Sequence, residues 1–523
     1  MTRTWLLALA VLLACGREPD CGTSATPERK NVVLVTIDTL RADHLGCYGN
    51  ATVRTPNLDA LAAEGALFER CWSQTHLTVP SHMSIMTSRP LAEHGVIDNT
   101  GGGARPVPAL PGVFAEAGYQ TAAFVGARLV SPLGTLGPLL QGFGTWHGPR
   151  RISVPFRAEE TNRDVFRWLR QSCRDPFFLW VHYWDSHMPY TPPPPFDRAY
   201  FEGDPRDPSQ TSMQPVVLNW FFYDLADLPR RLARQAALVR RLKTTLATSS
   251  RGVRRALLDP ARLPGDVPPP PELRTLAARV RRGLPYKRPL ADWLAGVTDV
   301  RFPLAQYAGE VSYVDREFGR LRAEIERLGI ASRTAIVVTA DHGESLGEHG
   351  VYFDHFGLHE PDLRVPLIVW APGRVAPARR PDPTNGLDVA PTVLRLAGLP
   401  PVAAMRGRDL LDPPAAAEPI VVESASGLQV GVVDGNLKLI RSLRRFHYVD
   451  AFARDAGTTE LYDLAADPGE RDDLAARRPD VRDALARRLD AWIAAHPAAS
   501  TAPSPADVAP DKLRELRALG YVE

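Results

Sequence analysis

Three runs of apolar residues most constrain what this chain can fold into. They cover residues 31–37 (NVVLVTI), 176–183 (PFFLWVHY) and 334–340 (TAIVVTA). An unbroken apolar run of this length predicts a strand buried on both faces, as in a largely parallel sheet covered by helices. Apolar residues at helical spacing over 305–328 and 388–397 predict such helices. The sequence therefore predicts an α/β fold.

Polar residues follow each run where the predicted strand ends. Asp38 comes directly after the first run, Asp185 and His187 lie just past the second, and Asp341 and His342 follow the third. In open α/β folds the carboxyl ends of the strands form the edge at which ligands bind. Asp38 alone could equally cap the next helix, but the set together predicts a polar site at that edge.

Thr78 places a hydroxyl at a predicted helix end. Two residues later comes Pro80, and proline is favoured in the first turn of a helix. We therefore expect a helix that begins near Pro80, with Thr78 at its positive N-terminus, where negative charge is favoured. A hydroxyl there is either an N-cap or an activated nucleophile. An isolated Thr-x-Pro-Ser would favour the cap, whereas the acidic residues elsewhere in this chain favour the nucleophile.

Asp38, Thr78, Asp341 and His342 form a candidate set of metal ligands. Two carboxylates, an imidazole and a hydroxyl suit zinc or manganese better than the all-oxygen cage of calcium, which stays an alternative. A bound cation would lower the pKa of the Thr78 hydroxyl. The resulting alkoxide would then attack a tetrahedral phosphorus or sulfur centre.

Composition and the N-terminus indicate an exported protein. The chain has 523 residues, 44% of them hydrophobic and 23% charged, and its net charge of +2 gives no electrostatic case for nucleic acid. Arg3 precedes a short apolar segment, and residues 12–16 (LLACG) are similar to a bacterial lipobox. We expect a signal peptide over 1–15, a lipid anchor on Cys15, a tether over 16–30 and a place in the bacterial cell envelope. An ordinary cleaved signal peptide is the alternative.

Further boundaries follow from changes in composition. We expect a catalytic domain over 31–410, a small antiparallel-sheet subdomain over 411–497 and a tail over 498–523. An early helix is predicted over 56–69. Residues 200–300 are rich in arginine and proline and are interpreted as an insertion. It is either a lid for an anionic substrate, a surface that contacts anionic lipid, or a solvated pair of helices.

Eight ordered motifs between residues 31 and 470 resemble the sulfatases of the alkaline phosphatase superfamily. Among them are NVVLVTIDTLRADHLGCYG (31–49), TVPSHMSIMTSRP (78–90), PFFLWVHYWDSHMPY (176–190) and TADHGESLGEHG (339–350). The resemblance implies an alkaline-phosphatase-like sandwich with a large central mixed sheet flanked by helices, and a small C-terminal antiparallel sheet. It also implies a divalent metal at Asp38, Asp341 and His342.

The departures from the family pattern change the expected chemistry. Sulfatases carry Cys or Ser in C/S-x-P-S-R, which is oxidised to formylglycine, whereas this chain has Thr78 and His82 at the two ends of that motif. A threonine could yield only a ketone, so no formylglycine is expected. The family's second Asp is here Thr39, its Gly-Lys-x-His is replaced by Gly126-Ala127-Arg128-Leu129, and its later Lys corresponds to His355.

His82, His187 and His355 complete the catalytic candidates beside Thr78. By resemblance to the phosphodiesterases of the superfamily, Asp185, His187 and His355 could hold a second metal. The favoured alternative is that the two histidines donate hydrogen bonds to substrate oxygens.

The sequence predicts a metal-dependent ester hydrolase that uses Thr78 directly, with phosphate favoured over sulfate. The anionic ester could belong to a glycan or a lipid. One alternative is a transferase that passes a phosphoryl headgroup to a lipid or glycan. Another is a catalytically silent binding protein with the same fold.

Overall fold

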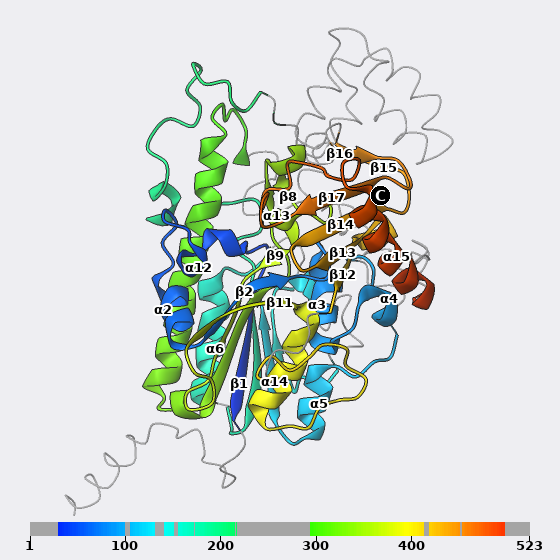
Figure 1. Cartoon of the computed structure of the whole chain (residues 1–523). Coiled ribbons are helices and arrows are strands. Elements are labelled where there is room, and N and C mark those ends of the chain that lie inside the picture. The colour runs from blue at the N-terminus through cyan, green and yellow to red at the C-terminus, as the bar shows by residue number, and fades with distance from the viewer. Residues whose placement is uncertain are drawn as a thin grey trace, which may run out of the picture.

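A computed structural model describes residues 30–99, 105–130, 141–150, 155–171, 173–214, 216, 293–412, 418–449 and 452–496. Within these residues the centre is a nine-stranded mixed sheet of order β11-β2-β10-β6-β1-β5-β3-β4, with β9 paired to β2 (Figure 1). Its strands are β1 (Asn31–Ile37), β2 (Ala66–Trp72), β3 (Gln120–Val125), β4 (Thr145–His147), β5 (Phe177–Tyr183), β6 (Thr334–Ala340), β9 (Arg364–Val365), β10 (Leu367–Trp370) and β11 (Ala378–Asn385). The three apolar runs form the adjacent strands β5, β1 and β6, which are parallel as predicted.

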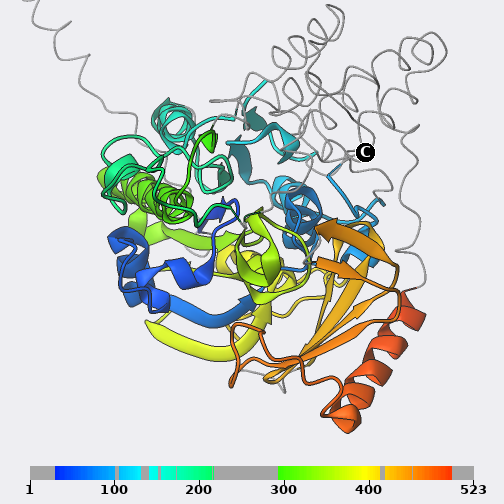
Figure 2. The same ribbon diagram turned by 90° about the horizontal axis from the view of Figure 1, so that it is seen from above.

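Helices cover both faces of this sheet (Figure 2). One face carries α2 (Pro56–Glu64), α6 (Ala158–Gln171) and α12 (Arg301–Arg327), and the other carries α3 (Thr78–Thr87), α5 (Leu110–Glu116) and α14 (Val389–Ala397). Two short helices, α4 (Leu91–His94) and α13 (Glu360–Leu363), lie at its margins. The predicted α/β class with a large mixed sheet flanked by helices is therefore confirmed.

The helix predicted over 56–69 is wrong in its second half. The helix α2 ends at Glu64, and residues 66–72 form β2 instead. Gly65 stands at the break, where a Cβ atom would lie 2.4 Å from the carbonyl oxygen of Val369 in β10. Only glycine allows this close approach, and strand pairing then outweighs the helical spacing of the sequence.

The small C-terminal sheet is also confirmed. Its antiparallel order is β12 (Ile420–Glu423), β13 (Gln429–Asp434), β14 (Leu437–Ser442) and β17 (Thr459–Asp463), and α15 (Pro479–Ala495) packs on it. Two short hairpins, β7 (Ser345–Leu346) with β8 (Tyr352–Asp354) and β15 (Phe446–Val449) with β16 (Phe452–Arg454), complete the strands. The opposite face of the sheet packs against Trp72, Leu358 and Leu363 of the main body.

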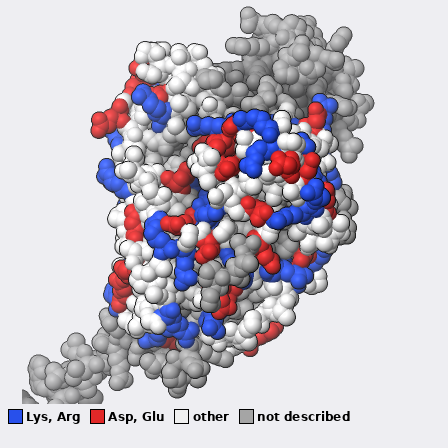
Figure 3. All heavy atoms as spheres, viewed as in Figure 1, with Lys and Arg blue, Asp and Glu red and all other residues white. Residues whose placement is uncertain are grey.

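Lys and Arg are interspersed with Asp and Glu over the described part of the face shown in Figure 3. Among the described residues, no helix combines the length and the apolar character needed to cross a bilayer. The predicted signal peptide, nearly all of the tether, most of the insertion (217–292) and the tail lie outside the described residues.

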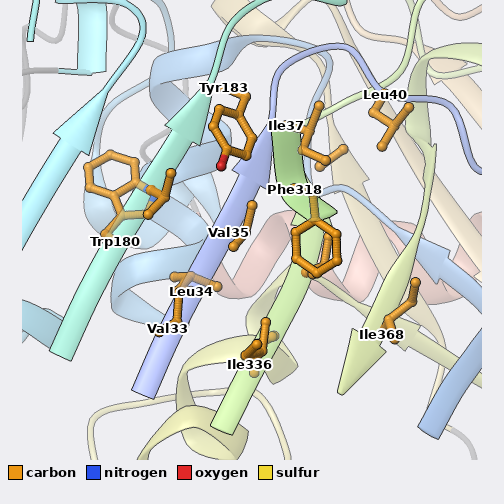
Figure 4. Close-up of a cluster of buried hydrophobic side chains, with 14 of the residues drawn as sticks. Val33, Leu34, Val35, Ile37, Leu40, Trp180, Tyr183, Phe318, Ile336 and Ile368 are labelled. Atoms are coloured by element: carbon orange, nitrogen blue, oxygen red, sulfur yellow. The ribbon is translucent and has the colours of Figure 1, made fainter. Parts of the chain in front are cut away.

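The core places the site. All seven residues of β1 are buried, and the strand lies between β5 and β6, where its side chains, such as Val35, belong to the same buried cluster as Trp180 and Ile336 (Figure 4). Ile37 pairs with Tyr183 on one side and with Ala340 on the other. Because parallel strands end at a common edge, the residues that follow Ile37 and Ala340 emerge side by side.

Candidate active site

Asp38, Asp341 and His342 meet at this edge. All three are buried, and each offers a ligand atom within 4.8 Å of the others. The Nε2 atom of His342 lies 3.5 Å from Oδ2 of Asp341 and 3.9 Å from Oδ1 of Asp38. The structure thus brings Asp38 next to Asp341 and His342, which follow it by more than 300 positions in the chain.

Thr78 joins this group from the first residue of α3, two residues earlier than the predicted helix start. Its Oγ1 atom lies 3.3 Å from Nε2 of His342, and the Nδ1–H group of His342 donates to the carbonyl oxygen of Gly343 at 2.9 Å. That bond fixes the tautomer, so Nε2 carries a lone pair toward the hydroxyl. The contact with His342 is the hydrogen-bonding contact of Oγ1 within the described residues, and the N–H of Val79 in the same turn donates to Oδ1 of Asn99 at 2.9 Å.

The two carboxylates fit a cation. Neither oxygen of Asp38, nor Oδ2 of Asp341, has a hydrogen-bond partner within the described residues. Burial raises the pKa of Asp38 well above its ordinary value, and burial together with the charge of Asp38 does the same for Asp341. Oδ1 of Asp341 accepts from the backbone N–H groups of Thr39 and His342. Two buried carboxylates with three oxygens left without a hydrogen bond are costly to ionise unless a positive charge lies between them. The residues present therefore suit a divalent cation with oxygen and nitrogen ligands.

His82 lies behind the nucleophile helix. Its Nδ1–H group donates to the carbonyl oxygen of Thr78 at 2.7 Å, and its Nε2 atom accepts from the hydroxyl of Thr36 at 3.0 Å. The Thr36 oxygen in turn accepts from the indole N–H of Trp180 at 2.9 Å. Burial holds the pKa of His82 well below its ordinary value, so the ring is neutral. Such a ring orients the backbone of Thr78 rather than supplying a positive charge.

His355 and His187 lie next to His342. The ring centroids of His355 and His342 are 4.2 Å apart, and those of His187 and His355 are 5.6 Å apart. The Nδ1–H group of His355 donates to the carbonyl oxygen of His76, and that of His187 donates to the carbonyl oxygen of Met188, both at 2.7 Å. In this tautomer the Nε2 atoms carry lone pairs. They therefore suit a cation, a water molecule or a substrate hydroxyl better than the predicted donation to ester oxygens.

Asp185 lies apart from those two rings. Its Oδ2 atom accepts from the backbone N–H of Ala158 at 2.7 Å, at the start of α6, and Arg157 lies 3.8 Å from Oδ1. A carboxylate is favoured at a helix N-terminus, which explains why it turns this way. Among the described residues, Asp185, His187 and His355 do not form a group with metal-ligand spacing. The predicted second site thus lacks its carboxylate.

The family assignment rests on a match along most of the chain. The family model described as Sulfatase matches residues 30–133 and 157–399. The chain belongs to the sulfatase family. The resemblance predicted from the motifs is therefore confirmed.

Curated relatives of this sulfatase-family chain include two with sulfated sugar names. The N-acetylglucosamine-6-O-sulfatase of Bacteroides thetaiotaomicron is 25% identical, over 90% of this chain and 87% of the relative. The human iduronate 2-sulfatase is also 25% identical, over 71% of this chain and 64% of the relative. Together with the family match, these relatives support the coarse assignment of an ester hydrolase.

Solved structures confirm the sulfatase fold. A protein in complex with its substrate D-glucosamine-2-N,6-O-disulfate superposes with a TM-score of 0.62 at 22% identity, covering 90% of this chain and 98% of that one. The phosphonate monoester hydrolase of Agrobacterium radiobacter superposes with a TM-score of 0.60 at 21% identity, covering 90% and 96%.

Two histidines at this sulfatase-family site were missed from the sequence. His76 donates from Nδ1 to the carbonyl oxygen of His355 at 3.1 Å and accepts at Nε2 from the N–H of Ala425, so it links the site to the small-sheet part. His182 lies within β5, beside Asp38. In the sequence, His182 reads as an ordinary residue of the apolar run 176–183. The alternation of side chains along a strand, which places His182 on the same face as Trp180, could have indicated that it lies on a buried face.

Proposed function

We propose that this chain is an exported, cation-dependent ester hydrolase in which Thr78 is the direct nucleophile. The observation that carries the proposal is the 3.3 Å contact between Oγ1 of Thr78 and Nε2 of His342, beside the hydrogen-bond-free carboxylate of Asp38. A hydroxyl that neither caps its helix nor faces solvent is suited to another task.

The residues divide the work as follows. A divalent cation held by Asp38, Asp341 and His342 would supply Lewis-acid activation of the Thr78 hydroxyl and of a substrate oxygen. The Thr78 oxygen forms a bond to phosphorus while the bond to the ester oxygen breaks, and the proton leaves with the alcohol. Water then cleaves the Thr78 ester. The Nε2 lone pairs of His187 and His355 suit the orientation of that water.

Charge favours a monoanionic substrate. Burial lowers the pKa of every histidine at the site, so these rings are uncharged at neutral pH. They are His76, His82, His182, His187, His342 and His355. The charges of the two carboxylates, Asp38 and Asp341, and of one divalent cation then sum to zero. A site without net charge accepts one negative charge more readily than two. We therefore expect a phosphodiester to react faster than a phosphate monoester.

A sulfate ester is the second candidate. It also carries a single negative charge, and relatives named for sulfated sugars point to a glycan substrate. A threonine cannot form the aldehyde of formylglycine, so the nucleophile favours phosphate. A transferase would use the same covalent step, with an acceptor alcohol of a lipid or glycan in place of water. A silent binding protein would cleave none of these esters.

Export and anchoring belong to the same proposal. Residues 12–16 (LLACG) predict a lipid on Cys15 and a place in the cell envelope, and Cys173 is disulfide-bonded, as is common outside the reducing cytosol. Labelled palmitate should enter the wild-type chain expressed in bacteria and not the Cys15→Ala variant. Equal labelling of both would contradict the anchor.

The test of the function is a matched panel of nitrophenyl esters. The purified full-length chain is offered a sulfate, a phosphate monoester and a phosphodiester, each with Mn²⁺, Zn²⁺ or Ca²⁺, and Thr78→Ala is the control. We expect phosphodiester cleavage that requires the cation and is lost in Thr78→Ala. When alcohols are added, we expect the second product beside nitrophenol to remain nitrophenyl phosphate, whereas a transferase would form its alkyl ester. Faster cleavage of the sulfate would overturn the preference for phosphate.

A further inference from the structure

His182 is a buried histidine to which the proposed chemistry gives no role. It is fully buried near the end of β5, and within the described residues neither ring nitrogen has a hydrogen-bond partner. It lies on the same face of the strand as Trp180, and its ring is 5.0 Å from that of His82 in α3. A buried imidazole with both nitrogens unpaired is costly unless something binds it.

The carboxylate of Asp38 lies beside this ring. The Nε2 atom of His182 is 3.3 Å from Oδ2 of Asp38, and neither atom has a hydrogen bond within the described residues. Among the described residues, His182 forms a group with His82 and Asp341 whose ligand atoms all lie within 4.8 Å of one another, and Asp341 is also part of the group with Asp38 and His342. Two atoms bound to the same tetrahedral zinc at 2.0–2.1 Å lie about 3.3 Å apart. The spacing is that of two ligands on one ion.

His82 belongs to the same spatial group but is not a second ligand. Its Nδ1 atom, which lies 3.6 Å from Oδ2 of Asp341, carries the hydrogen that Thr78 accepts, and its Nε2 atom accepts from Thr36. Neither nitrogen therefore has a lone pair to give to a cation. Of the two rings, only His182 can bind one without losing a hydrogen bond.

We propose that His182 is a ligand, through Nε2, of the cation held by Asp38, Asp341 and His342. The inference rests on the cation of the proposed function. It adds a ligand from β5, a strand that supplies no residue to the predicted set of metal ligands. Two imidazoles and two carboxylates form a site for a transition-metal ion such as zinc or manganese, and they disfavour calcium, which prefers oxygen ligands.

The direct test counts imidazoles on the wild-type protein. The purified full-length chain is stripped with a chelator, loaded with Cu²⁺ and studied by pulsed EPR, which registers each coordinated imidazole. We expect two in the wild-type protein, from His182 and His342, and one in His182→Gln. One imidazole in the wild-type protein, or two in His182→Gln, would overturn the inference and leave the proposed function intact, whereas a protein that binds no divalent cation would contradict both.

Variants give a second readout through Zn²⁺ affinity, measured by competition with a chromophoric chelator. His182→Gln should bind Zn²⁺ at least about tenfold more weakly, a loss typical of changes around a metal. His182→Glu, which has similar reach and supplies a carboxylate oxygen, should bind more tightly than His182→Gln. Equal or weaker binding by His182→Glu than by His182→Gln would contradict the proposal.

His94→Gln is the matched control. His94 is a buried histidine of α4 that contacts the hydroxyl of Ser84 at 3.1 Å and lies outside both groups with metal-ligand spacing found among the described residues. Its substitution should leave the affinity for Zn²⁺ unchanged. A similar loss in His94→Gln would mean that removal of any buried imidazole weakens the site, and it would count against a specific role for His182.

Discussion

At the scale of the residue, hydrogen bonds decide what each histidine can do. The chain from Trp180 through Thr36 to His82 ends on the carbonyl oxygen of Thr78. This series assigns the Nδ1–H tautomer to His82 and excludes both a positive charge and a metal bond. His82 is therefore a positioning residue, which holds the first turn of α3 so that Oγ1 of Thr78 faces the cation site.

Substitution of His82 tests this role. His82→Phe keeps a ring but removes the bond to Thr78, and we expect kcat to fall by about 10–100-fold with Zn²⁺ affinity unchanged, as for other groups that orient a site. His82→Asn can still donate from a position close to that of Nδ1 and should recover much of kcat. Steady-state kinetics of the two variants decide the matter, and an Asn variant as slow as the Phe variant would refute the positioning role.

The candidate ligands could be predicted because they depend on strand ends. Asp38, Asp341 and His342 follow runs whose parallel pairing fixes where they emerge. His182 and Asp185 could not be assigned in the same way. Which neighbour a buried imidazole meets depends on the register of β5 with β1, and the direction of Asp185 depends on the backbone N–H of Ala158 in α6. Neither partner is close in sequence.

At the scale of the element, a buried charge network ties the small sheet to the main body. Lys438 of β14 is fully buried and lies 3.0 Å from a carboxylate oxygen of Glu360 in α13 and 2.9 Å from one of Glu470. The two carboxylates raise the pKa of Lys438 although burial opposes this. Glu360 also accepts from the indole of Trp72 in β2. The orientation of β14 is thus linked to two elements of the catalytic body.

Removal of the Lys438 side chain should lower the free energy of unfolding. Lys438→Met leaves Glu360 and Glu470 buried without their cation, and breaking such a pair typically costs about 3–5 kcal/mol. Arg441→Met on the same strand is the control, because its ion pair with Asp490 is exposed at the carboxylate and should contribute at most about 1 kcal/mol. Unfolding in urea measures both. If Lys438→Met lost less free energy of unfolding than Arg441→Met, the network would contribute little to stability.

At the scale of the whole molecule, the site joins segments that are far apart in the chain. Asp38 follows β1, Thr78 begins α3, and Asp341 follows β6. A cation among them therefore stabilises the folded chain as well as the reaction, since the unfolded chain has no such site. The large fold could be predicted because long buried strands and eight motifs indicate it. The end of the predicted 56–69 helix could not be placed correctly, because the formation of β2 depends on its pairing with β10 and β11.

Removal of the cation should make stability depend on pH. In the cation-free protein the pKa values of Asp38 and Asp341 are raised above their ordinary 3.8, so folding favours their protonated forms. Their contribution is fully present below that value and is lost as the pH rises through the raised values. We expect the melting temperature after chelation to fall with rising pH relative to that of the Zn²⁺-loaded protein. A difference that stays constant from pH 5 to pH 8 would argue against buried, unpaired carboxylates.

The most direct test of the central claim is a search for the covalent intermediate on Thr78. The Zn²⁺- or Mn²⁺-loaded protein is mixed with bis(nitrophenyl) phosphate, quenched in acid within the first turnover, and its peptides are measured by mass spectrometry. We predict a nitrophenylphosphoryl group on the peptide that contains Thr78, present also in Thr78→Ser and absent from Thr78→Ala. Continued turnover by Thr78→Ala, with no adduct in the wild-type protein, would mean that water attacks the ester directly and that Thr78 is not the nucleophile.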